Sequence, residues 1–349
     1  MTEEYSQTLE GIELNVAGIS TGLFSNNLDL ISSKEYFGGT AHPAVTEGMG
    51  WQIHSQEANF QIATSALQDD ADLKGSFSIL DKKNAEPAIE IREERVTACG
   101  DWSRLEEVAT DRRYSLLGNQ GVLFRYLLTV LERCGIFSFH ACGLLEKESG
   151  TTCLVLGERG SGKSALLLAA LASGRYLSFG TEIVHAGLDE NGLCFYRSSL
   201  RNNVRLGHMI HDFPRLTEEI GVSFSDIDDP WNTKVQLDFS QFSVKEDKIS
   251  GRQTILVIPR IEEEVSQPMT NRIEGADLTR LKRNLVENIS DKICSLALIY
   301  ETVPVGTLDN PGLMEHRISF VDDILRSGNI VAANTVFASP LNCLEGLKA

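Results

Sequence analysis

The stretch CLVLGERGSGKSALLLAAL, residues 153–171, determines how the rest of the chain is interpreted. An apolar run leads into the spacing G-x-x-x-x-G-K-[ST], formed by Gly157, Gly162, Lys163 and Ser164, and a second apolar run of helical composition follows. Glycines allow the backbone angles that point successive N–H groups at one anion, and the N-terminus of a following helix adds partial positive charge. The pattern therefore predicts a strand–loop–helix unit that binds nucleotide phosphates.

Individual residues of this loop have expected roles. Lys163 is expected to reach the β- and γ-phosphates, and Ser164 to supply a hydroxyl to Mg²⁺. The helix is expected to run from Lys163 to Ser173 and to end at Gly174. A random chain of this length would match the spacing roughly once in a hundred, with a glycine-rich turn of no function as the alternative. The predicted nucleotide-binding residues are Gly157, Glu158, Arg159, Gly160, Ser161, Gly162, Lys163 and Ser164.

Composition and charge exclude some classes of protein. The chain has 349 residues, of which 42% are hydrophobic and 23% charged, as in ordinary globular proteins. Its 49 acidic residues outnumber 32 basic ones and give a formal net charge of -17. Such a surface repels nucleic acid and anionic membranes unless basic residues are concentrated in one patch, and the sequence has no run of Lys or Arg. We expect neither nucleic acid nor a membrane as a partner.

The cysteines and the apolar runs indicate a cytoplasmic location. The seven cysteines are scattered, without a C-x-x-C pair or a metal-ligand spacing, which is typical of reduced thiols in a core. The beginning of the sequence, MTEEYSQTLEG, is acidic and polar, unlike a signal peptide. The longest apolar runs, such as residues 165–172, are far shorter than a bilayer span.

The sequence predicts a domain boundary near residue 118, which no linker marks sharply. Residues 1–118 alternate short β-rich pieces with turns and predict a smaller β-rich domain, in which the isolated His42 and His54 are not expected to be catalytic. Residues 119–349 are expected to form the larger domain. The predicted strands of the first part are IELNVAG (12–18), NFQIATS (59–65), GSFSIL (75–80) and AIEIREERV (88–96).

The larger part predicts an α/β fold, a P-loop mixed sheet with flanking helices. A helix is expected over 119–135, capped by Asn119 and ended by Gly135. A long helix is expected over 277–301, capped by Asp277, and a last one within 316–328. The predicted strands are IFSFHACGLLE and TTCLVLG, separated by a KESG hairpin turn, then RYLSF, EIVHAGL, LCFYR and GRQTILVIPRI.

One order of elements resembles a known family. A helix, the strand FHACGLLE, a turn, the strand TTCLVLG, the loop, its helix and a Gly-Arg-x-Leu-Ser entry to the next strand resemble the catalytic domain of HPr kinase/phosphorylase. Phosphoenolpyruvate carboxykinase is a more distant relative of that family. The resemblance covers about residues 119–200 and implies ATP and Mg²⁺ as cofactors. It also implies that His140 lies near the transferred phosphate.

The sequence departs from that family at its acidic pair. The family has two aspartates after the loop helix, which bind Mg²⁺ and act as general base, whereas GRYLSFGTEIV places Phe179-Gly180 or Gly180-Thr181 there. Glu182 is the nearest carboxylate, one or two residues later, and is the predicted catalytic acid and, with Ser164, the predicted metal ligand. A shift of one residue turns a strand side chain to the other face. Glu182 therefore replaces the pair only if a bulge or turn re-aims it.

A basic segment follows the predicted strands. YRSSLRNNVRLGH contains Arg197, Arg201 and Arg205, which are the predicted substrate-binding residues, together with His208. Arginine at such spacing suits phosphate or carboxylate recognition. An exposed helix that pairs with the acidic surface would have the same composition, and the sequence leaves both interpretations open.

Together these features predict an ATP-dependent kinase that phosphorylates a hydroxyl on a small molecule or peptide. The missing aspartates motivate an alternative, a degenerate nucleotide-binding protein that acts as a regulatory or partner module. A plain P-loop NTPase would need Glu301 or another carboxylate on a strand beside the loop strand, while Asp322 and Asp323 fit a solvated helix face. The sequence lacks an N-K-x-D element and an LSGGQ signature, which argues against a small GTPase and a transporter ATPase. Kinases of this type often form oligomers, so a homo-oligomer is consistent with the resemblance.

Overall fold

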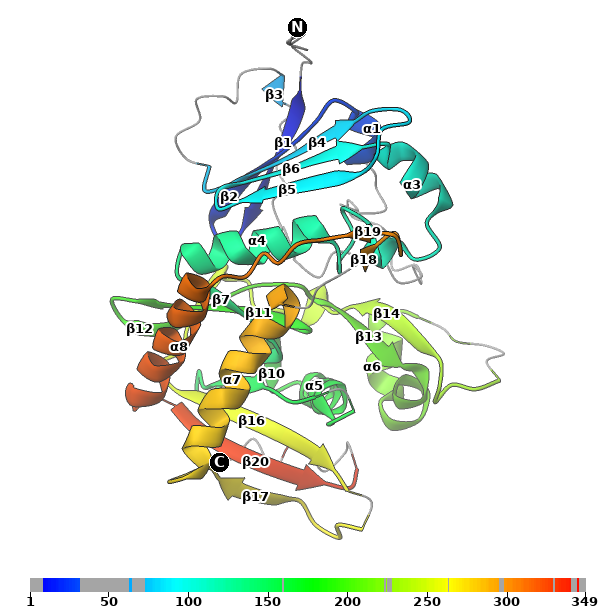
Figure 1. Cartoon of the computed structure of the whole chain (residues 1–349). Coiled ribbons are helices and arrows are strands. Elements are labelled where there is room, and N and C mark those ends of the chain that lie inside the picture. Colours follow the sequence, from blue (N-terminus) through cyan, green and yellow to red (C-terminus); the bar gives the residue numbers. More distant parts are fainter. Residues whose placement is uncertain are drawn as a thin grey trace, which may run out of the picture.

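The computed structural model describes residues 9–31, 63–64, 73–158, 160–222, 224, 228–262, 264–294, 298–328, 330–339 and 344. Within these residues the strands form two six-stranded sheets, one four-stranded sheet and two small two-stranded sheets. One six-stranded sheet lies at the N-terminal end of the molecule, and the other two large sheets lie on the far side of helix α4, Val122–Arg133 (Figure 1).

The N-terminal sheet has the strand order β3-β1-β2-β4-β6-β5 and is built entirely from residues before 101. The predicted strands at 12–18 and 75–80 are confirmed, whereas most of 59–65 lies outside the described residues. The predicted strand at 88–96 is instead an antiparallel hairpin, because the chain turns at residues 93–94. His42 and His54 also lie outside the described residues. The elements are β1 (Glu10–Val16), β2 (Ile19–Ser25), α1 (Leu28–Ile31), β3 (Ala63–Thr64), β4 (Ser76–Asp81), β5 (Ala88–Arg92), β6 (Arg95–Gly100) and α3 (Trp102–Val108).

The second six-stranded sheet is mixed and has the order β10-β8-β9-β16-β20-β17. Strands β9, β16 and β20 are parallel, and every residue of β9 is buried, as is usual for a central strand covered on both faces. The predicted hairpin between β8 and β9 is confirmed by their antiparallel pairing. The strands are β8 (Cys142–Glu146), β9 (Thr152–Val155), β10 (Tyr176–Gly180), β16 (Thr254–Ile261), β17 (Met269–Arg272) and β20 (Ile330–Phe337).

The chain passes between this sheet and the four-stranded sheet, of order β15-β12-β11-β7, at two adjacent points. It leaves β7 (Ile136–His140) for β8 at Ala141, and it leaves β10 for β11 (Ile183–Asp189) at Thr181 and Glu182. The backbone N–H of Ala141 donates to the carbonyl of Glu182 at 3.1 Å, which joins the two crossings. We call Ala141, Thr181 and Glu182 the sheet junction. The remaining strands of this sheet are β12 (Gly192–Tyr196) and β15 (Lys248–Ser250).

Helices cover the sheets, and three predicted helix limits need correction. The last helix, α8, begins at Pro311 and so does not lie within 316–328. Gly121, not Asn119, occupies the N-cap position of α4, without a side-chain hydrogen bond. The long helix α7 (Asp277–Cys294) stops well before 301, and Asp277 is its first residue rather than its cap. Residues 298–299 instead form a strand of a small hairpin. The other helices are α5 (Lys163–Ala172), α6 (Pro214–Ile220), α8 (Pro311–Arg326), a π-helix (His208–Asp212) and 3₁₀ turns at Arg112–Tyr114 and Ser240–Phe242.

The two small hairpins complete the fold. They pair β13 (Arg201–Arg205) with β14 (Lys234–Asp238), and β18 (Leu298–Ile299) with β19 (Val303–Pro304). The first hairpin belongs to the core that buries the leucine face of α5, and the second to the core shared by the N-terminal sheet and α4. The division near residue 118 stays a prediction, because α4 packs against elements on both of its sides.

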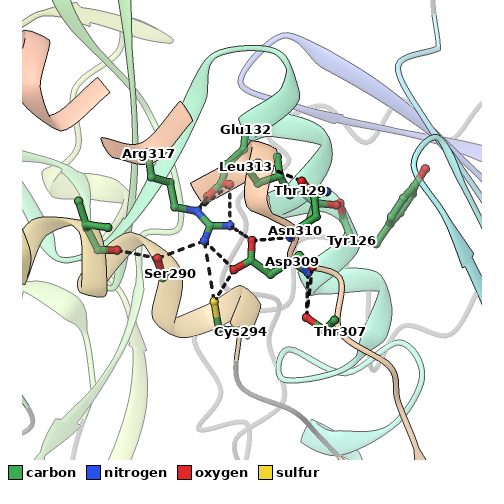
Figure 2. A network of polar contacts seen from close by, with 11 residues as sticks. Tyr126, Thr129, Glu132, Ser290, Cys294, Thr307, Asp309, Asn310, Leu313 and Arg317 are labelled. Carbon is green, nitrogen blue, oxygen red and sulfur yellow. Dashed lines mark hydrogen bonds and ion pairs between the residues drawn. The ribbon is translucent and has the colours of Figure 1, made fainter. Parts of the chain in front are cut away.

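A buried arginine holds three helices together (Figure 2). Arg317 of α8 has no exposed side-chain area, and its Nε donates to both carboxylate oxygens of Glu132 on α4, at 3.0 and 2.9 Å. The same guanidinium donates to Asp309 at 3.0 and 2.8 Å and to Ser290 of α7 at 3.1 Å. Burial raises the pKa of Glu132 to about 7 against the opposing effect of Arg317. Hydrogen bonds from Arg317 and Cys294 hold the pKa of Asp309 below its usual value despite burial.

Replacing Arg317 by Met should destabilise the protein strongly. Two buried carboxylates would lose their cation, and breaking a buried ion pair from one side costs about 3–5 kcal/mol. Urea denaturation would measure the loss. The matched control is Arg326→Met on the same helix, whose side chain is 76% exposed and whose loss should change stability by no more than about 0.5 kcal/mol. Equal, small losses in both variants would contradict a structural role for the buried cluster.

A second buried polar pair lies in the four-stranded sheet. His185 of β11 and Ser138 of β7 are directly opposite each other, and the Ser138 Oγ to His185 Nδ1 distance is 2.8 Å. Among the described residues the His185 Nε2 has no hydrogen-bond partner. Burial lowers the pKa of His185 from 6.5 to about 4. The folded protein therefore keeps this imidazole neutral.

The pH dependence of stability should reveal this histidine. Between pH 6.5 and about 4 the unfolded chain binds a proton at His185 that the folded state does not, so stability falls as the pH is lowered through this range. The double variant Ser138→Ala/His185→Leu should reduce that slope by about 1.4 kcal/mol per pH unit. Denaturation at several pH values measures it. His316→Leu, at an exposed position of α8, should keep the wild-type slope, and an unchanged slope in the double variant would refute the assignment.

Candidate functional site

The predicted strand–loop–helix unit is present. Strand β9 ends at Val155 and helix α5 begins at Lys163, as the sequence predicts. Gly162 precedes the helix with φ +105°, and a Cβ there would lie 3.0 Å from both Ile261 and Phe337. Only glycine combines that backbone angle with so close an approach of the neighbouring strands. Arg159 lies outside the described residues.

The side chain of Lys163 turns back onto its own loop. Its amino group donates to the carbonyl oxygens of Gly157 and, at 3.0 Å, of Glu158. Burial lowers the pKa of Lys163, whereas the nearby Cys142 and Glu182 act in the opposite direction. The amine is thus half-buried above the loop, where it can exchange these carbonyl oxygens for those of an anion.

Two serines complete the loop. The Oγ of Ser161 is buried and has no hydrogen-bond partner among the described residues, so it can donate to an oxygen held by the loop. Ser164 is half-buried in the first turn of α5, beside Lys163. Gly160, which directly precedes Ser161 in the loop, is exposed with φ +86°. These residues fit phosphate oxygens through donors and, at Ser164, a metal ion through an oxygen ligand.

His140 ends strand β7 and is held from helix α7. The backbone N–H of His140 donates to Asn288 Oδ1 at 2.8 Å, and Asn288 Nδ2 donates to the His140 carbonyl at 3.2 Å. Burial, together with the charges of Lys292 and Lys163, lowers the pKa of His140 to about 3. The imidazole is therefore neutral at physiological pH and carries one N–H donor.

Glu182 lies at the sheet junction, after an irregularity in β10. The pairing register of β10 with β8 shifts between Ser178 and Gly180, and a bend follows at Thr181 and Glu182 before β11 begins. An irregularity and a turn are the features that are needed to change the face of the strand on which the Glu182 side chain lies. Burial lowers the pKa of Lys163 and raises that of Cys142, and the charge of Glu182 acts to raise the pKa of both, so Glu182 interacts electrostatically with the loop lysine.

At Gly180 and Thr181, one of the two placements expected for the family's acidic pair, packing and hydrogen bonds leave no space for a carboxylate side chain. A Cβ on Gly180 would lie 2.4 Å from Ser198 Oγ and 2.6 Å from the carbonyl oxygen of Ile183. Thr181 is buried, and its Oγ1 donates to the carbonyls of Ser199 at 3.0 Å and Arg201 at 2.7 Å. Glu182 is consequently the acidic residue that this turn brings toward the loop.

The three candidate arginines lie near one another along the chain but each has a local partner. Arg197 forms an ion pair with Asp247, Arg201 lies 3.9 Å from Asp238, and Arg205 donates to the carbonyl of Trp231. Residues 201–205 form strand β13, so the exposed-helix interpretation is wrong. The strand forms because Val204 and Leu206 are buried against the α5 core while the arginines alternate to the outside.

The carboxylates considered for a plain NTPase lie elsewhere. Glu301 is in the turn between β18 and β19, where Thr110 Oγ1 donates to it at 2.8 Å, and it is not on a strand beside β9. The neighbours of β9 at its loop end are Cys142 on β8 and Val257 on β16. Asp322 forms ion pairs with Lys282 and Arg326, as expected of a solvated helix face.

Sequence reasoning missed three residues of the site, namely Cys142, Asn288 and Lys292. The thiol of Cys142 donates to the carbonyl of Thr181 at 2.9 Å, and burial raises its pKa to about 12. Asn288 and Lys292 lie four residues apart on α7, a spacing that places them on one helix face. That spacing was the available signal, but nothing local in the sequence linked it to the loop.

Comparisons with known proteins give matches in structure but none in sequence. No protein-family model matches the sequence, and no curated protein matches it either. In structure, the chain is similar to the Hpr(Ser) kinase/phosphatase from Coxiella burnetii, at 13% identity and a TM-score of 0.27. The match covers 60% of this chain and 93% of the other. A TM-score this low does not establish a common fold. Among the described residues, none of the helices is long and apolar enough to cross a membrane.

Substituting Gly180 should test the tight packing of the sheet junction. Gly180→Ala brings a methyl group against a backbone oxygen that is 2.6 Å away, and overpacking of this kind costs about 1–3 kcal/mol. The control is Gly306→Ala, whose Cβ would meet only Ile91, at 3.9 Å, and which should stabilise the protein by up to about 1 kcal/mol. Chemical denaturation compares them. A Gly180→Ala variant as stable as the wild type would show that the junction can relax.

Proposed function

We propose that the chain binds a nucleoside triphosphate at the loop and transfers its γ-phosphoryl group to a hydroxyl on a small molecule or peptide. The observation that carries the proposal is that the charge of Lys163 acts on His140, which directly precedes the sheet junction, and that the charge of Glu182, within the junction, acts on Lys163. A cation, a neutral hydrogen-bond donor and a carboxylate are the groups that phosphoryl transfer requires. ATP is the nucleotide that the resemblance to HPr kinase implies.

The loop supports phosphate binding through its own donors. The N–H groups of the loop and the N-terminus of α5 would hold the phosphates, and Ser161 Oγ would gain the partner that it lacks. Lys163 would leave the carbonyls of Gly157 and Glu158 and donate to phosphate oxygens instead. Ser164 and Glu182 would hold Mg²⁺, which would neutralise charge on the phosphates.

Transfer requires few further groups. The oxygen of the acceptor hydroxyl forms a bond to the γ-phosphorus while the bond to the β-phosphate oxygen breaks, and the diphosphate leaves with the electron pair. The hydroxyl proton passes to the carboxylate of Glu182. His140, which is neutral, donates a hydrogen bond to a phosphate oxygen and takes no proton from the acceptor.

The acceptor would lie on the side of strand β13. Thr181 Oγ1 donates to the backbone carbonyl of Arg201, which brings the start of β13 to the sheet junction. The guanidinium of Arg201 is held only loosely by Asp238, at 3.9 Å, and is the arginine best placed to bind an acceptor group. Arg197 and Arg205, with shorter contacts, would support the strand from either end.

A second function, nucleotide binding without transfer, is favoured by Gly180 and Thr181. The first has no space for a side chain and the second uses its hydroxyl within the backbone of the junction. A site with one carboxylate in place of two would then hold a nucleotide and act through a partner protein.

The two functions differ in what Glu182 does. We would incubate the protein with Mg²⁺, ATP labelled on the γ-phosphate, and an extract of small metabolites and peptides. If the chain is a kinase, label enters a new compound, and both Lys163→Ala and Glu182→Gln lower the rate by about a hundredfold or more. Glu190→Gln, at an exposed turn, is the matched control and should keep the full rate.

Measurements of ATP binding distinguish the kinase from the binding module. Glu182→Gln should still bind ATP, whereas Lys163→Ala should lose most of its affinity, because only Lys163 faces the loop carbonyls. ATP binding without label transfer or hydrolysis in the wild type would favour the binding module. A wild-type protein that binds no nucleotide would refute both functions.

A further inference from the structure

Helix α7 brings a second lysine to the site. Asn288 anchors the helix to β7, since its side chain donates to and accepts from the backbone of His140 at 3.2 and 2.8 Å. Lys292 follows one helical turn later on the same face of α7 and is half-buried. The anchor therefore fixes Lys292 beside the end of β7 that carries His140.

The charges around Lys292 indicate that it shares a site with Lys163. After burial, the charge of Lys292 is the largest factor that lowers the pKa of His140, and the charge of Lys163 is the next, so both lysines lie close to this histidine. Among the described residues no carboxylate lies within ion-pair distance of either lysine, and Glu182 acts on Lys163 only from farther away. Two half-buried cations without a paired anion are unfavourable in the empty protein.

This arrangement is notable in a chain with a net charge of -17, where carboxylates are abundant. Most basic residues described here with an ion pair have it at the surface, for example Lys282 with Asp322 and Lys248 with Asp189. Lysines that converge at one point without such partners form a site for an anion that arrives from solution. The neutral N–H of His140 adds a third donor.

We propose that Lys292 is the second cation of the phosphate site and binds the terminal phosphate of the nucleotide together with Lys163. The inference rests on the proposed function and extends it. The loop amides and the N-terminus of α5 would hold the inner phosphates, which would leave the terminal phosphate to the side chains beside the loop. There Lys292 and His140 meet it, which makes the site selective for a triphosphate over a diphosphate.

Calorimetric titration with ADP and with a non-hydrolysable ATP analogue tests the proposal directly. Lys292→Met should weaken binding of the ATP analogue by about tenfold or more, the value of one charge-assisted hydrogen bond, and that of ADP by less than about twofold. Lys292→Arg should restore part of the lost affinity. Arg283→Met is the control on the same helix, 77% exposed, and should change neither affinity. Equal weakening of both nucleotides, or no weakening, would overturn the role of Lys292.

A failure of the proposed function would look different. If the wild type binds neither nucleotide, the proposed function is wrong, and titration with pyrophosphate then decides the inference. Pyrophosphate binding that is lost in Lys292→Met but kept in Arg283→Met would support a two-lysine anion site. Equal pyrophosphate binding by both variants, or none by the wild type, would overturn it. Thermal unfolding should confirm that Lys292→Met is folded, since the variant removes a cation that has no ion pair with any of the described residues.

Discussion

The buried ion pairs of Arg317 are the interaction on which the site depends (Figure 2). One guanidinium binds Glu132 of α4, Asp309 before α8 and Ser290 of α7, and it thereby sets the position of α7 relative to its neighbours. Removing charges from water is costly, so this cluster is formed only when all of its members are in place. Helix α7 in turn holds the end of β7 through Asn288, two residues before Ser290. The geometry around His140 thus follows from a cluster that contains no functional residue.

The sheet junction supplies the other constraint. Two chain crossings lie side by side there, and the hydrogen bond from Ala141 to Glu182 joins them. A register shift in β10 and the bend after it turn Glu182 toward the loop lysine. Gly180 has no space for a side chain, and the hydroxyl of Thr181 is used in backbone hydrogen bonds. Of these three consecutive residues only Glu182 is acidic, and the junction explains why neither Gly180 nor Thr181 could be replaced by a carboxylate there.

Local patterns predicted the elements whose residues meet their partners nearby, and failed where distant contacts prevail. The strand before the loop, α4 and β16 were predicted because apolar periodicity and flanking glycines specify them. The predicted end of α7 at residue 301 was wrong, because Leu298 and Ile299 pair with Val303 and Pro304 in a hairpin that joins the core of the N-terminal sheet. Strand β20, Ile330–Phe337, was missed because the polar residues within it interrupt its apolar pattern. It forms through parallel pairing with β16.

The sequence by itself predicted the strand–loop–helix unit, since the spacing of Gly157, Gly162, Lys163 and Ser164 specifies local backbone geometry that any strand and helix on either side would reproduce. The sequence also identified His140 and Glu182 as candidates. Only the tertiary structure brought these two together with Asn288 and Lys292, because contacts such as that of His140 with Asn288 span 148 residues. Spacing along the chain carries no information about such pairs. They form because burying the apolar faces of α4, α7 and α8 fixes these helices relative to one another, with the buried Arg317 paired to Glu132.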